Sequence, residues 1–240
     1  DYADLPDVLE YLAAAKQDVI DNVELFRHGD GQEGKAPSPE DAQFTRYQVN
    51  LLVDNGELAG APVIYEDNPT YLNLIGRIEH LARMGTLITD FTLIKPGALH
   101  RANGGYLILD AIKLLTHPFA WAALKRVLRS REIRLESLER LLSLASTISL
   151  EPQAIPVSVK VAVIGERLLY YLLNAYDPEF GQLFKVAADF AEDMERLPAN
   201  DPLYARLIAS LQRHRKLRPL TRSAVARVIE QAARRAADGE

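Results

Sequence analysis

Two glycines and the apolar run behind them constrain the fold of this chain more than any other stretch. Gly104 and Gly105 precede four apolar residues, 106–109, and the run ends at Asp110. A short apolar run bounded by glycine is typical of a buried strand in a parallel sheet. Ligands of open α/β sheets gather at the carboxyl ends of such strands, so Asp110 is a candidate Mg²⁺ ligand of a nucleotide-binding enzyme. The alternative is an Asp that caps a helix beginning at Ala111.

Composition narrows the class of protein further. The chain has 240 residues, of which 48% are hydrophobic and 25% charged, values typical of an ordinary globular protein in water. No apolar run approaches the ~20 residues that span a bilayer, so we expect no membrane partner. The net charge of −5 argues against a broad nucleic-acid surface. Cysteine is absent, which excludes thiol catalysis and favours the cytoplasm. Because the first residue is Asp1, we expect a piece of a longer protein.

Periodicity and turn chemistry divide the chain into segments. We predict a long helix over 6–27, a loop over 28–43, strands over 47–53 and 62–65, and a helix over 68–83. A hairpin or extended loop over 86–94 and the strand that ends at Asp110 follow. Further elements are expected at 118–129 (helix), 132–136 and 157–164 (strands), and 167–175, 203–215 and 221–237 (helices). The change from mixed to purely helical pattern places a domain boundary near Pro198.

Two longer strings point to a family. The first is Asn68-Pro69-Thr70 followed by residues 76–80, and the second is the run 95–110, which reads KPGALHRANGGYLILD. Together they resemble the AAA+ module of Lon-like ATP-dependent proteases, and most of all the archaeal-type Lon B group. The resemblance covers residues 45–237. It implies a P-loop AAA+-like three-layer α/β sandwich with a parallel core sheet (45–197), followed by a small α-helical lid (198–240), with 1–44 as the end of an upstream insertion.

Several parts of a working ATPase are missing or changed. No Gly-x-x-x-x-Gly-Lys-Ser/Thr occurs, so the phosphate-binding loop is absent from this sequence. The Glu that usually follows the strand-end Asp and activates water is replaced by Ala111. The resemblance places Glu166 at a sensor of the γ-phosphate, although a Glu at a helix N-terminus is the simpler reading. The segment 179–183, where an arginine finger is expected, contains no Arg. We therefore expect Asp110 and Glu166 to be the remaining nucleotide-site residues and hydrolysis to be degraded.

Two further sets of residues have two readings each, and Trp121 has one. The resemblance makes Met84, Leu87 and Phe91 candidates for a substrate-gripping pore loop, against an ordinary buried hairpin. A cluster of arginines, called the basic patch, can face a neighbouring subunit's nucleotide or form a solvated helix end. Its members are Arg126, Arg129, Arg131 and Arg134. Trp121 is most simply a core side chain.

The resemblance implies the AAA+ unfoldase portion of an ATP-dependent serine protease. No Gly-x-Ser-x-Gly and no Ser–Lys protease motif occurs here, so we expect no peptide cleavage by this chain alone. ATP and Mg²⁺ are expected cofactors of the intact protein, with none bound by this piece. Expected partners are unfolded or misfolded proteins and further copies in a homo-oligomeric ring. The alternatives are a non-hydrolysing assembly and substrate-docking module and a DNA-processing relative, which predicts salt-sensitive DNA binding.

Overall fold

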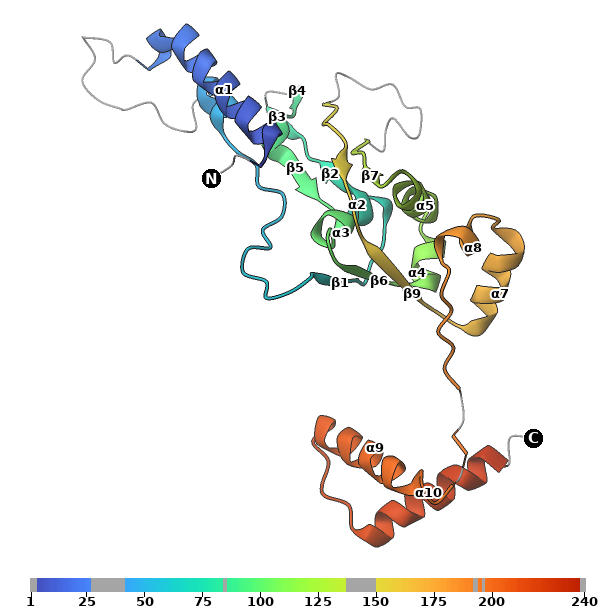
Figure 1. Cartoon of the computed structure of the whole chain (residues 1–240). Coiled ribbons are helices and arrows are strands. Elements are labelled where there is room, and N and C mark those ends of the chain that lie inside the picture. Colours follow the sequence, from blue (N-terminus) through green and yellow to red (C-terminus); the bar gives the residue numbers. More distant parts are fainter. Residues whose placement is uncertain are drawn as a thin grey trace. The chain divides into compact units, whose positions relative to one another are not determined.

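The computed structural model forms two compact units, 1–183 and 184–240 (Figure 1). It describes residues 4–26, 42–83, 86–136, 150–191, 194–195 and 197–237. Each unit is considered by itself. The domain limits expected from the sequence stay a prediction. No helix among the described residues is long and apolar enough to cross a membrane.

A three-stranded parallel sheet is the centre of the first unit. Its strands are β1 (Val63–Glu66), β6 (Tyr106–Asp110) and β9 (Lys160–Ile164), in the order β1-β6-β9. The register pairs Ile64 with Leu107 and Leu107 with Val161. The predicted α/β class with a parallel core sheet is confirmed. The strand after the two glycines is the middle one, as its apolar run indicates.

Side chains alternate across this sheet, and its two faces differ. Leu107 and Leu109 are fully buried on one face. Short helices complete this core: α2 (Tyr71–Ile75), α3 (Ala98–Arg101), α4 (Ala111–Thr116) and α5 (Ala120–Ser130). The opposite face is largely exposed, with exposures of 62% for Val63, 57% for Tyr65 and 60% for Ile164. Parallel sheets are normally covered on both faces, so this surface is incomplete as a core.

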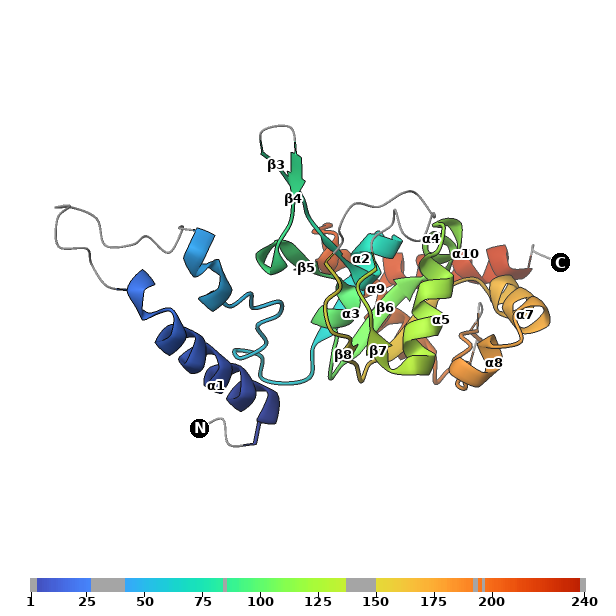
Figure 2. The ribbon, with the colours of Figure 1, turned by 90° about the horizontal axis from the view of Figure 1, so that it is seen from above.

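The predicted helix over 68–83 is wrong beyond Ile75. Gly76 takes a φ of 97°, a left-handed conformation that ends α2. The chain continues as β2 (Gly76–Ile78), which pairs antiparallel with β5 (Ile94–Pro96). Beyond them β3 (Leu81–Arg83) and β4 (Thr86–Ile88) form a hairpin, followed by η3 (Phe91–Leu93). Figure 2 shows this hairpin extending away from the central sheet.

The predicted strand over 47–53 is also wrong. Tyr47 ends the 3-10 helix η2 (Ala42–Tyr47), and no strand follows before β1. Side chains hold this segment instead of a strand ladder. The Tyr47 hydroxyl donates to the Asp18 carboxylate at 2.6 Å, and the Asn50 amide donates to the carbonyl oxygens of Phe91 and Ile94. Asp18 belongs to α1 (Pro6–Asp21), which is followed by η1 (Val23–Leu25).

Shorter elements link the sheet to the rest of the first unit. The strands β7 (Glu132–Ile133) and β8 (Ile155–Pro156) pair antiparallel after α5. The helices α7 (Arg167–Tyr176) and α8 (Phe180–Leu183) follow β9. In the second unit, α9 (Asp201–His214) contacts α10 (Arg222–Ala237). Thr221 precedes α10, and its hydroxyl accepts a bond from the Ala224 amide, which is the predicted cap.

His100 is a buried polar residue of this core. It is 5% exposed, and its Nδ1 accepts a hydrogen bond from the Gly97 amide at 3.2 Å. Its Nε2 is buried and has no partner among the described residues. Burial lowers the pKa of His100 to about 4. The ring is therefore neutral in the folded protein at ordinary pH.

Close packing at Gly97 leads to a first prediction. A Cβ there would lie 2.3 Å from the Leu74 carbonyl oxygen, so two backbone segments would have to separate. We expect Gly97→Ala to lower the free energy of unfolding by at least about 2 kcal/mol in urea denaturation. Gly60→Ala is the control, because a Cβ at Gly60 meets nothing within 4 Å. Equal stability of the two variants would contradict the packing described.

The second prediction concerns acid stability. The pKa of His100 lies below that of an unfolded histidine, so the unfolded state binds the extra proton and stability falls as pH drops from about 6.5 towards 4. At pH 5 the loss from this group is about 2 kcal/mol relative to pH 7. Urea denaturation at both pH values should show this loss in the parent chain and in the control His214→Gln, whose side chain is exposed. His100→Gln should show a smaller loss, and an unchanged loss would contradict the assignment.

Candidate functional site

Acidic residues lie at or just after the ends of the parallel strands, but no three potential ligands among the described residues form a group that could hold a metal ion. Asp110 is the last residue of β6, Glu66 the last of β1, and Glu166 follows β9 by two residues. The register pairs Asp110 with Ile164, so these ends share one edge of the sheet. Among the described residues, neither Asp110 nor Glu166 forms an ion pair. The carboxylate oxygens at this edge are ligands of the kind that Mg²⁺ prefers.

Asp110 has a structural role as well. Its Oδ1 accepts a hydrogen bond from the Lys113 amide at 2.9 Å, which caps the N-terminus of α4. The capping alternative raised by the sequence is therefore present. A metal role for Asp110 stays a prediction, and it would use the oxygen that the cap leaves open.

Two cations neutralise part of the acidic edge. Lys113 pairs with Asp67, and Arg101 pairs with Glu66 at 2.8 Å. The hydrogen bond from Lys113 lowers the pKa of Asp67, and the same bond raises the pKa of Lys113. Asp67 stays ionised in this arrangement. The edge thus keeps two carboxylates, those of Asp110 and Glu166, outside any ion pair among the described residues.

Ala111 is buried beside this edge of the sheet. It is 3% exposed, and a Cβ built on Gly165 would be only 2.6 Å from the Ala111 Cβ. The end of β9 therefore packs directly on the first turn of α4. Glu166 occupies the N-cap position of α7 without a capping hydrogen bond from its side chain. The structure brings Asp110, Ala111 and Glu166 to adjacent strand ends.

The pore-loop candidates belong to another part of the first unit. Leu87 is in β4, and Phe91 begins η3 with a partly exposed side chain. Met84 lies outside the described residues. Neither Leu87 nor Phe91 is on the sheet that carries Asp110. Their role stays a prediction.

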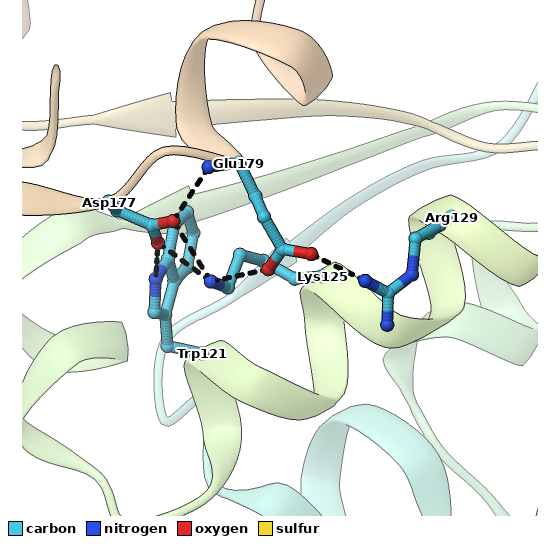
Figure 3. Close-up of polar contacts among 5 residues, drawn as sticks. All are labelled: Trp121, Lys125, Arg129, Asp177 and Glu179. Atoms are coloured by element: carbon cyan, nitrogen blue, oxygen red, sulfur yellow. Dashed lines mark hydrogen bonds and ion pairs between the residues drawn. The ribbon is translucent and has the colours of Figure 1, made fainter.

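A network of charged and aromatic side chains joins α5 to the turn between α7 and α8 (Figure 3). Lys125 Nζ lies 2.8 Å from the Asp177 carboxylate and 2.8 Å from that of Glu179. Trp121 Nε1 donates to Asp177 at 2.7 Å, and Arg129 pairs with Glu179. The side chains of Lys125 and Asp177 are only 17% and 13% exposed. This network fixes where α7 ends.

The charges in the network balance one another. Burial alone would lower the pKa of Lys125, but hydrogen bonds to Asp177 and Glu179 raise it above its usual value. Burial alone would raise the pKa of Asp177, but its bonds from Lys125 and Trp121 lower it. The bond from Lys125 likewise lowers the pKa of Glu179. All the charged members therefore stay ionised around neutral pH.

Sequence reasoning missed this network. It treated Trp121 as a core side chain, whereas the indole is half-buried and hydrogen-bonded. The available signal was the i, i+4 spacing of Trp121, Lys125 and Arg129 along one face of a helix. The acids opposite them are 52 residues further along the chain for Lys125 and Asp177, and no local pattern reveals such a pair. Three arginines of the expected basic patch have acidic partners: Arg126 with Glu136, Arg129 with Glu179, and Arg134 with Glu132.

Comparison with known proteins identifies the family. A family model described as "LonB-like, AAA domain" matches residues 59–191, more than half of the chain. The chain belongs to the LonB-like AAA domain family. The matched range contains the parallel sheet, the Asp110 edge and the Trp121–Lys125 network. The predicted Lon-like AAA+ identity is confirmed, and the narrower archaeal-type assignment stays a prediction.

A curated relative is "Putative Lon protease homolog" of Escherichia coli (strain K12). It is 26% identical over 129 residues, which are 53% of this chain and 21% of the relative. The chain thus spans about a fifth of that relative's length. A crystal structure of NtrX from Brucella abortus is 19% identical, with a TM-score of 0.41, and covers 69% of this chain and 35% of that one.

A third prediction tests the network of this LonB-like module. Lys125→Met should lower the free energy of unfolding by about 1–2 kcal/mol, because the shielded Asp177 loses its cation and Glu179 keeps only Arg129. It should also raise the pKa values of Asp177 and Glu179, measured by carboxyl ¹³C NMR titration. Arg77→Met removes an exposed ion pair with Glu79 and serves as the control, with an effect below about 0.5 kcal/mol. Unchanged carboxyl pKa values in Lys125→Met would rule out the described role of Lys125.

Proposed function

We propose that this LonB-like module is the AAA+ portion of a Lon-like ATP-dependent protease, and that its ATP hydrolysis is weakened. The intact protein would act on unfolded or misfolded proteins as a homo-oligomeric ring in the cytoplasm, and its serine protease centre would lie in another domain. One observation carries the proposal: the family match spans a sheet whose middle strand ends in Asp110 and is followed by a buried alanine.

The donor set at the strand ends fits a magnesium ion better than it fits phosphate. Asp110 and Glu166 supply carboxylate oxygens, which suit Mg²⁺ and repel phosphate oxygens. The sequence has no phosphate-binding loop. Asp110 would hold the ion, and the bound nucleotide would supply the phosphoanhydride that is hydrolysed. The backbone donors for its phosphates would come from a part of the protein outside this sequence.

The exposed face of the sheet supports the proposal that a part of the protein outside this sequence completes the nucleotide site. Val63, Tyr65 and Ile164 would stay in water unless another segment covers them. By strand alternation Asp110 belongs to the same face as Ile108 and Tyr106, two and four residues before it. A segment that covered this face would therefore also reach the carboxylate.

Weak hydrolysis follows from the residues next to Asp110. Ala111 has no group to polarise an attacking water, and its contact with Gly165 leaves little room beside it. A negative charge at Glu166 would disfavour the γ-phosphate unless a cation compensates it. The segment 179–183 contains no Arg or Lys, so it offers no cation to a neighbouring subunit. Its Glu179 pairs with Lys125 and Arg129. Leu87 of β4 and Phe91 of η3 would grip the substrate, together with Met84, which lies outside the described residues.

The burial of Ala111 also favours a second candidate function. A module that has lost hydrolysis altogether could keep the AAA+ shape for assembly and substrate docking. The buried Ala111 is the observation that favours it, because restoring a carboxylate there would require the first turn of α4 to move.

Nucleotide titration separates the two functions and is the fourth prediction. A fluorescent ATP analogue with Mg²⁺ should not saturate this chain, and it should saturate a longer chain that includes the flanking segments. Asp110→Asn in the longer chain should remove the Mg²⁺ dependence, because one ligand oxygen is lost. Slow phosphate release by the longer chain would support the weakened ATPase. Absence of binding to either chain would support the assembly module, and salt-sensitive DNA binding would support the DNA-processing reading.

A further inference from the structure

A shallow groove on α5 combines features that the nucleotide site does not use. It has a volume of about 300 Å³. Its lining consists of Tyr71, Phe119, Ala122, Ala123, Lys125, Arg126, Arg129 and Glu179. The spacing along α5 puts Phe119, Ala122, Arg126 and Arg129 on one side of the helix. The groove thus has an apolar end at Phe119 and a polar end at the arginines.

Phe119 is held in an unusual conformation. It has a φ of 64° and a ψ of −14°, in the left-handed region that bulky residues rarely adopt. The residue is 45% exposed. Backbone strain of this kind tends to persist at binding sites and functional turns. Here it keeps an aromatic ring at the mouth of the groove.

Tyr71 contributes a buried hydroxyl beneath the groove. The residue is 4% exposed, and its hydroxyl has no hydrogen-bond partner among the described residues. Burial raises the pKa of Tyr71, and the nearby Arg126 charge opposes that rise. Arg126 is a long side chain that is 40% exposed, so a ligand that draws it outward would give the hydroxyl access to an acceptor. Buried hydroxyls without partners are rare.

The arginines retain unused donors. Arg126 reaches Glu136 through one nitrogen at 3.2 Å, and Arg129 reaches Glu179 through one nitrogen. A guanidinium group has five N–H donors, so each can also bind an acceptor from a ligand. Lys125 is already shared by Asp177 and Glu179. With Glu136 included, three cations face three carboxylates. The charges balance, so a ligand binds here through the spare N–H donors, and a singly charged carboxylate adds less repulsion than a doubly charged phosphate.

We propose that this groove binds an acidic residue next to an aromatic residue in an extended protein segment. The carboxylate would lie between Arg126 and Arg129 above the Tyr71 hydroxyl, and the aromatic side chain would lie against Phe119 and Ala122. The small volume fits one large side chain with an adjacent carboxylate. The inference deepens the proposed function, because it rests on a protein substrate or partner and not on nucleotide.

Peptide titration followed by ¹⁵N NMR tests the proposal on this chain without nucleotide. The probe is acetyl-Phe-Asp-amide, and acetyl-Phe-Asn-amide is the matched neutral peptide. We expect the Asp peptide to bind at least about fivefold more tightly and to shift the amides of Phe119, Ala122 and Ala123. Equal binding of the two peptides, shifts confined to other elements, or equal displacement by inorganic phosphate would overturn the proposal.

Variants make up the fifth prediction. Tyr71→Phe and Arg126→Gln should each weaken the Asp peptide about three- to tenfold and leave the Asn peptide unchanged. Phe119→Asn should weaken both peptides, and it keeps a residue type that tolerates the left-handed backbone. Tyr204→Phe and Arg213→Gln, both on α9, are the matched controls and should bind like the parent chain. If Tyr71→Phe and Arg126→Gln both bind like the parent chain, the groove is not the site. Loss of nucleotide binding in the longer chain would leave this result unaffected, so the two proposals fail separately.

Discussion

The burial of Leu107 and Leu109 is the interaction on which the first unit depends. Both side chains are fully buried in the middle strand, so they fix which face of the sheet packs against the helices. Because side chains alternate along a strand, the same choice assigns Tyr106, Ile108 and Asp110 to the other face. The position of the Asp110 carboxylate thus follows from the packing of two leucines. A register shift of one residue would bury Asp110 and expose the core.

The sequence predicted the parts of this structure that depend on local signals. Residues 104–110 predicted a strand of the parallel sheet and its terminal Asp, and Thr221 predicted the cap of α10. The prediction failed where distant segments decide the conformation. The helix over 68–83 ends at Gly76 because β5 pairs with the residues that follow, and the segment after Tyr47 is held by bonds to Asp18. Neither partner is visible in a local window.

The candidate site was likewise predicted from the sequence only in part. Asp110 was predicted because it ends an apolar strand, and Glu166 because the family resemblance places it after another core strand. The parallel register brings those strand ends together. The network of Lys125, Asp177 and Glu179 was not predicted, since Lys125 comes from α5 and the two acids from the turn between α7 and α8, and their charges look like ordinary surface residues in sequence. The family match explains why both groups fall within one module, but only the three-dimensional arrangement shows that they are different sites.

The bond between Trp121 and Asp177 also has an optical consequence. Trp121 is the sole tryptophan of the chain, so ultraviolet emission excited at the indole band comes from one place. Its ring donates to a carboxylate and lies 5.7 Å from the Lys125 ammonium and 6.2 Å from the Phe180 ring. Any rearrangement that pulls α8 away from α5 would change the polarity around this chromophore. The molecule therefore carries a built-in reporter for the junction of these helices, with no added dye.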